Sequence, residues 1–365
     1  MNASSCPFNN GTVNAGIAGT LAALSYCADV TDSVPNALSG WSVAWRADQS
    51  IDGSYAYIAQ TDDQSQYVVA IRGSETDFSW STFYNWIEQD LNVLTQKPWQ
   101  YPSDGSSMIS WGSELALNDL TELVDSSSGS AVSMLQFLTG TAVKNGTPIA
   151  VVGHSLGGNL TTVFAPWLYY QISQAGGTVP PMATYTFAAP TAGNASFAAM
   201  YDKLFGSNSW RFYNAIDIIP RFSDDARSVG QLWTPAPNAG QITVQYNHTT
   251  ISLSQFFGLL ADAIDASELY YGSYYTQTNQ SQGTIVLNSA DTLDPTYNQS
   301  TLTDWLDQAG WQHSMQTYLS LLGAAGTTCI TAANDVVARD ARALRNPKTI
   351  TAYLDAKLSG VKTPA

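Results

Sequence analysis

Along the chain, short apolar runs alternate with segments in which apolar residues recur with the period of a helix. The clearest example of a run followed by such a segment lies in residues 148–170. The apolar run 149–152 is rich in β-branched side chains, so it predicts a buried strand. Residues 159–170 have the period of a helix, and Pro166 is expected to kink or break that helix. The apolar stripe of the helix consists of Leu160, Val163, Phe164 and Trp167.

The same reading applied to the whole chain predicts strands that alternate with helices. The predicted strands are 41–45, 55–59, 66–72, 149–152, 183–188 and 210–215. The predicted helices are 13–28, 81–94, 111–123, 132–143, 159–170 and 253–269. This alternation predicts a single α/β domain over residues 1–365, with a mostly parallel central sheet and helices on both of its faces.

Residues 153–157, GHSLG, fit the pattern G-x-S-x-G between the first strand and helix described above. In this pattern a tight strand-to-helix turn lifts a nucleophilic serine, here Ser155, above the sheet. A Cβ at Gly153 or Gly157 is expected to meet neighbouring backbone in so tight a turn. The alternative is an ordinary serine in a glycine-rich turn.

Composition narrows the class of protein. The chain has 365 residues, 44% hydrophobic and 12% aromatic, which suffices for a packed core. Its net charge of −15 argues against nucleic acid and against attraction to anionic membranes. Only 12% of residues are charged, which favours a secreted protein. No apolar run reaches transmembrane length, and the N-terminal residues do not have the pattern of a signal peptide.

The cysteines are Cys6, Cys27 and Cys329. The sequence is compatible with two arrangements: either one disulfide and one free thiol, or three free thiols. No C-x-x-C pair or histidine cluster indicates a metal site, and no cofactor is implied.

A serine nucleophile needs a base, and the base needs an acid that orients it. Of the three histidines, His154 lies inside the turn and is expected to be a packed core residue. Both His248 and His313 follow Ser155, as the base must in this type of fold, and His313 is placed at the start of a helix.

The acid should follow a strand, and Asp217 comes directly after the predicted strand 210–215. The alternative for Asp217 is a capping or turn aspartate. Asp224 and Asp225 lie in a more polar stretch and are expected to be solvated carboxylates of a loop. Two N–H donors must face the developing oxyanion: one is expected from Leu156, and the other from Ser74 after the strand 66–72.

Eight segments of this chain, in this order, resemble the class 3 lipase family, the filamentous-fungal type of α/β-hydrolase. They are ALSYC (23–27), VVAIRGSE (68–75), NWIEQDL (85–91), SWGSELAL (110–117), VVGHSLGGNL (151–160), TFAAPTAGN (186–194), NAIDIIP (214–220) and HSMQTYL (313–319).

The resemblance implies Ser155 as nucleophile, Asp217 as acid and His313 as base, and it separates His313 from His248. It also implies that Ser74 and Leu156 form the oxyanion hole. A lid is expected at 76–89. Two departures from compact members are an insertion or cap region at 223–300 and a C-terminal helical extension at 323–365.

The expected activity is that of a secreted serine carboxylester hydrolase acting on triacylglycerol or another ester at an oil–water interface. A phospholipase A1, a soluble-ester esterase and a non-catalytic lipid binder are the alternatives. The sequence leaves the oligomeric state open.

Overall fold

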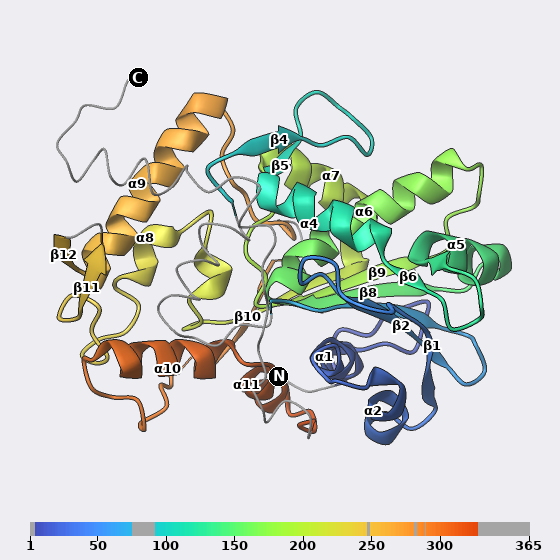
Figure 1. Cartoon of the computed structure of the whole chain (residues 1–365), viewed down its shortest axis with the longest axis horizontal. Coiled ribbons are helices and arrows are strands. Elements are labelled where there is room, and N and C mark those ends of the chain that lie inside the picture. The colour runs from blue at the N-terminus through green and yellow to red at the C-terminus, as the bar shows by residue number, and fades with distance from the viewer. Residues whose placement is uncertain (1–3, 75–91, 247–248, 281–282, 289, 328–365) are drawn as a thin grey trace.

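The computed structural model describes residues 4–74, 92–246, 249–280, 283–288 and 290–327 (Figure 1). The predicted lid at 76–89, His248 and nearly all of the extension 323–365 lie outside the described residues.

The first half of the chain contains the helices α1 (Ala15–Leu24), α2 (Val30–Ala37), α4 (Trp111–Glu122) and α5 (Met134–Leu138). Its strands are β1 (Trp41–Arg46), β2 (Ala56–Thr61), β3 (Tyr67–Ile71), β4 (Gln96–Pro98), β5 (Met108–Ser110), β6 (Val124–Asp125), β7 (Val132–Ser133) and β8 (Ile149–His154).

The second half contains the helices α6 (Leu156–Gln174), α7 (Ala195–Phe205), α8 (Ala226–Val229), α9 (Leu253–Tyr271), α10 (Leu302–His313) and α11 (Met315–Leu322). Its strands are β9 (Met182–Phe187), β10 (Ser209–Asn214), β11 (Thr243–Tyr246), β12 (Thr249–Ser252) and β13 (Ile285–Leu287).

The central sheet has seven strands in the order β1-β2-β3-β8-β9-β10-β13. β1, β2 and β3 pair antiparallel, whereas β3, β8, β9, β10 and β13 run parallel. The carboxyl ends of the parallel strands therefore meet at one edge of the sheet, which is where ligand sites lie in open α/β sheets.

Side chains alternate between the two faces of this sheet, as the period of two requires. Along β8, Ile149 and Val151 pack with α4, α6 and α7, whereas Ala150 and Val152 pack with α1 and α11. Figure 1 shows α4, α6 and α7 on one side of the sheet and α1, α2 and α11 on the other.

A third apolar core lies beyond the carboxyl edge of the sheet. It joins α8, α9, α10 and the loop around Ile216 and Ile218, with Phe256, Phe257 and Trp305 among its buried side chains. Figure 1 shows these elements at the left, where the parallel strands end. The predicted insertion 223–300 contributes to this core, but it also supplies β13 to the main sheet.

Three details of the structure differ from the sequence interpretation. Helix α6 is longer than predicted, and it runs through Pro166 without ending there. The predicted helix 132–143 begins as strand β7 and ends in a π-helical turn, Thr139–Val143. His313 ends helix α10 instead of starting a helix.

Candidate active site

The turn between β8 and α6 holds Ser155 in a backbone conformation that residues with a side chain rarely adopt. Its φ is 59° and its ψ is −128°, and such conformations cost about 1–3 kcal/mol. The Ser155 N–H donates to the Phe187 carbonyl (2.9 Å), and the Ser155 carbonyl accepts from Gly158 (2.9 Å) and Asn159 (3.0 Å). The start of α6 and the neighbouring strand β9 together impose this strained turn.

The glycines of the turn have the steric role that the sequence suggested. A Cβ at Gly153 would overlap the Gly157 carbonyl, and one at Gly157 would overlap the Ile71 carbonyl at the end of β3. A Cβ at Gly73 would lie 3.0 Å from the Ser155 Cβ. The loop after β3 therefore lies directly against the serine.

Both residues predicted to form the oxyanion hole lie near this turn. Leu156 is the first residue of α6, where backbone N–H groups lack intrahelical acceptors and the helix dipole favours negative charge. Ser74 follows Gly73 and is half-buried.

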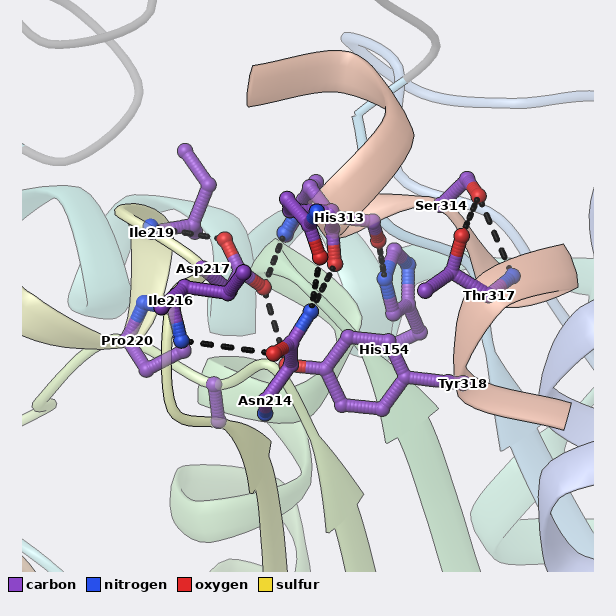
Figure 2. A network of polar contacts seen from close by, with 12 residues as sticks. His154, Asn214, Ile216, Asp217, Ile219, Pro220, His313, Ser314, Thr317 and Tyr318 are labelled. Atoms are coloured by element: carbon purple, nitrogen blue, oxygen red, sulfur yellow. Dashed lines mark hydrogen bonds and ion pairs between the residues drawn. The ribbon is translucent and has the colours of Figure 1, made fainter. Parts of the chain in front are cut away.

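Asp217 and His313, 96 positions apart in the chain, meet at the carboxyl edge of the sheet. His313 Nδ1 lies 2.9 Å from Asp217 Oδ2, and Asp217 is fully buried. The same Oδ2 accepts from the Tyr318 hydroxyl (2.8 Å), and Oδ1 accepts from the Ile219 N–H (3.0 Å). Figure 2 shows the carboxylate between His313 and Tyr318. This pairing is the one predicted for the acid and the base.

Tyr318 and Asn214 belong to this network, although the sequence analysis gave them no role. Burial, followed by the charge of Asp217, raises the pKa of Tyr318 well above its ordinary value, so its hydroxyl remains a donor. Asn214 donates its N–H to the Tyr318 oxygen (2.9 Å) and its side-chain amide to the Gln312 carbonyl (3.0 Å). Both lie in segments that carried the family resemblance, which was the available signal.

His154 is buried, as predicted for a core histidine. One ring nitrogen, Nδ1, lies 2.8 Å from the Tyr26 hydroxyl, and the other, Nε2, lies 2.7 Å from the main-chain oxygen of His313. Burial, followed by the charge of His313, holds the pKa of His154 well below its ordinary value. The ring is therefore a neutral part of the wall behind the Asp217–His313 pair.

The other candidate residues lie apart from this centre. Asp225 is exposed and forms an ion pair with Arg221 (3.2 Å), whereas Asp224 accepts from Gln277 (3.4 Å). Both are solvent-exposed, in agreement with their interpretation as loop charges.

Among the cysteines, Cys27 is disulfide-bonded and Cys6 carries a free thiol, which selects the first of the two arrangements considered above. Over the described residues, no group of three His, Cys, Asp or Glu side chains could hold a metal ion. None of the described helices is long and apolar enough to span a membrane.

Known proteins resemble this chain both in sequence and in structure. Residues 68–226 match the family model described as lipase (class 3). The chain is similar in structure to the crystal structure of M37 lipase, with a TM-score of 0.66, 23% identity and coverage of 84% of this chain and 92% of that one. This similarity confirms the predicted fold class.

Two fungal structures match a smaller part of the chain. The Rhizomucor miehei lipase–propeptide complex matches with a TM-score of 0.42, 22% identity and coverage of 56% of this chain and 61% of that one. Lipase II from Rhizopus niveus matches with a TM-score of 0.45, 18% identity and coverage of 56% and 72%. No curated protein sequence matches the chain.

Proposed function

We propose that this chain, whose residues 68–226 belong to the class 3 lipase family, is a serine carboxylester hydrolase that cleaves triacylglycerol esters. The observation that carries the proposal is the hydrogen-bonded pair of Asp217 and His313 beside the strained turn at Ser155. A nucleophile, a base and a buried acid in this chain order are the components of acyl transfer in an α/β-hydrolase.

In the proposed mechanism, the Ser155 Oγ attacks the ester carbonyl carbon while His313 Nε2 takes the hydroxyl proton. Asp217 accepts from His313 Nδ1 and stabilises the imidazolium that forms. The backbone N–H groups of Leu156 and Ser74 donate to the oxyanion of the tetrahedral intermediate. His313 then gives its proton to the leaving alkoxide, and an acyl-enzyme remains on Ser155. Water attacks this ester with the same histidine as base, which releases the acid.

Action at an oil–water interface is part of the proposal, and the end of α9 supports it. Leu269 and Tyr270, in the last turn of α9, and Tyr274, just after it, are 73%, 82% and 57% exposed, which makes them the most exposed large hydrophobic side chains of the described residues. Leucine and tyrosine favour an apolar surface bordered by water. The C-terminal end of α9 also contacts the segment after residue 91, because Ser267 donates to the Leu94 carbonyl (2.7 Å).

Secretion is a further part of the proposal. The disulfide at Cys27 supports it, since disulfides persist in oxidising compartments.

The test compares initial rates on emulsified long-chain triacylglycerol, phosphatidylcholine and a soluble butyrate ester, with Ser155→Ala as the blank. The proposal expects the highest rate on the emulsion and less than about a hundredth of that rate in the variant. A higher rate on phosphatidylcholine than on the emulsion would contradict the triacylglycerol assignment and would indicate a phospholipase A1. Covalent labelling by a fluorophosphonate should require Ser155, and a wild-type protein that is neither labelled nor active would overturn the hydrolase assignment.

A further inference from the structure

The imidazole of His154 lies between the Tyr26 hydroxyl and the main chain of His313. Strand β8 places it there, because His154 follows Val152 on the face of the sheet that packs against α1 and α11. The rings of His154 and His313 are 4.6 Å apart, with an interplanar angle of 38°. The residue before the proposed nucleophile therefore contacts both the ring and the backbone of the proposed base.

The partners of His154 determine which nitrogen carries the proton. The His313 oxygen is a carbonyl and can only accept, so Nε2 must be the donor. Burial keeps the ring neutral, which leaves Nδ1 as an acceptor. The Tyr26 hydroxyl therefore donates to Nδ1. The hydrogen bonds run in one direction, from the Tyr26 hydroxyl through the His154 ring to the His313 carbonyl.

This carbonyl needs an external donor, because the last carbonyls of a helix have no intrahelical partner. His313 is the final residue of α10. The preceding carbonyl, that of Gln312, accepts from Asn214 on β10. Side chains from β8 and β10 thus fix two successive peptide units at the point where the His313 side chain leaves the helix.

The neutrality of His154 also matters for the proposed reaction. His313 becomes a cation each time it takes the Ser155 proton, and a second cation 4.6 Å away would oppose this step. Among the described residues, Tyr26, Tyr318 and His313 face His154, and the two tyrosine hydroxyls are uncharged donors. The site therefore presents a neutral surface to the face of the catalytic ring.

We propose that Tyr26 and His154 form a relay of hydrogen bonds that positions His313 for proton transfer, and that the relay requires the neutral Nε2–H tautomer of His154. Tyr26 also contacts the loop after β3, since a Cβ at Gly73 would overlap its hydroxyl. The relay thus connects the strand that ends just before Ser155, the helix that ends at His313 and the proposed oxyanion loop. The inference rests on the function proposed above and assigns a positioning role within it.

The first experiment compares Tyr26→Phe with Tyr57→Phe on a soluble butyrate ester. Tyr57 is the matched control, because it is buried and its hydroxyl donates to the Leu21 carbonyl (2.7 Å), away from the site. Each variant removes one hydroxyl donor to a buried acceptor. Tyr26→Phe should lower kcat about tenfold with KM within about twofold, whereas Tyr57→Phe should retain kcat. Equal kcat values in the two variants would overturn the relay.

The second experiment asks whether a conservative side chain rescues the function. In His154→Gln, the amide nitrogen can still donate to the His313 carbonyl and the amide oxygen can still accept from Tyr26. His154→Leu removes both hydrogen bonds at similar volume. We expect His154→Gln to retain at least about ten times the kcat of His154→Leu. Equal losses in the two variants would show that only packing at this position matters.

The third experiment does not depend on activity. The chain has three histidines, so labelling histidine with 15N gives spectra that can be assigned by single substitutions. His154 should show a protonated Nε2 and an unprotonated Nδ1 at neutral pH and should keep them as the pH falls through the ordinary range of histidine titration. An Nδ1–H tautomer or a charged ring at pH 7 would overturn the relay. If the wild-type protein hydrolysed no ester, the proposed function would fail, and this spectrum would still decide whether the relay exists.

Discussion

Replacing Asp217 by asparagine tests the core of the proposed mechanism, because the two oxygens of this carboxylate have different partners. Oδ2 accepts from His313 and Tyr318, and Oδ1 accepts from the Ile219 N–H. An asparagine cannot satisfy all three donors. If its oxygen stays near Ile219, its amide group faces His313 Nδ1 and favours the tautomer that cannot accept the Ser155 proton.

The magnitude follows from the hydrogen bonds at Oδ2. Hydrogen bonds to a charged group contribute about 1.5–3 kcal/mol each, so losing the two at Oδ2 corresponds to about 3–6 kcal/mol. At about 1.36 kcal/mol per factor of ten, kcat should fall about 10²- to 10⁴-fold. KM should change little, because the lost interaction strengthens when the imidazolium forms.

The assay is the steady-state rate on a soluble butyrate ester, with thermal unfolding measured in parallel. Asp202→Asn is the matched control. Its carboxylate accepts from the N–H groups of Asn279 (2.6 Å) and Gln280 (2.7 Å), so the variant weakens hydrogen bonds to a carboxylate without touching His313. If Asp217→Asn kept more than about a tenth of the wild-type kcat, or lost no more than the Asp202→Asn control, Asp217 would not be the acid.

Three further predictions address the turn, the surface and the pH dependence. Gly157→Ala should destabilise the protein by about 1–3 kcal/mol in urea unfolding, because its Cβ would overlap a backbone carbonyl. Gly140→Ala, where a Cβ meets nothing within 4 Å, should be neutral or stabilising. The double variant Leu269→Ser and Tyr270→Ser should lower the rate on emulsified triacylglycerol several-fold and leave the soluble-ester rate unchanged, and equal changes would contradict an interfacial role. The pKa of His154 is depressed in the folded state, so the unfolded chain binds its proton first as the pH falls. Stability should therefore fall below about pH 6.5 by up to about 1.4 kcal/mol per pH unit, and His154→Gln should remove that slope in urea unfolding at a series of pH values.

Sequence reasoning placed the turn at Ser155 correctly because its determinants are local. A β-branched run, two glycines that cannot carry a Cβ and an amphipathic helix lie within about twenty residues. Asp217 could also be located, since it follows strand β10 by three positions. These are cases in which local pattern and tertiary structure agree.

Helix α10 was missed because no glycine or proline separates it from α11. Ser314 is both the C-cap of α10 and the N-cap of α11, and as N-cap its side chain accepts from the Thr317 N–H (3.2 Å). A single serine therefore ends one helix and starts the next, so the helix that begins at Met315 was read as beginning at His313. Strand β13 was missed because its three residues, Ile285–Leu287, are too few to show a period.

The contacts of His154 could not be derived from local pattern at all, because its partners lie 128 and 159 positions away. Asp217 and His313 are also far apart in the chain, by 96 positions, so local pattern does not show how they come together. In the structure, Asn214 links the two segments, because its side-chain amide donates to both the Gln312 carbonyl and the Gln312 side-chain oxygen. Its backbone N–H bonds Tyr318, which in turn donates to Asp217.

These bonds fix both ends of the intervening region at the carboxyl edge of the sheet, whatever the length of the chain between them. The cost of closing a longer loop grows only by about 0.6 kcal/mol per doubling of its length. The region between Asp217 and His313 can therefore build the third apolar core and add β13 to the sheet without displacing the acid from its histidine.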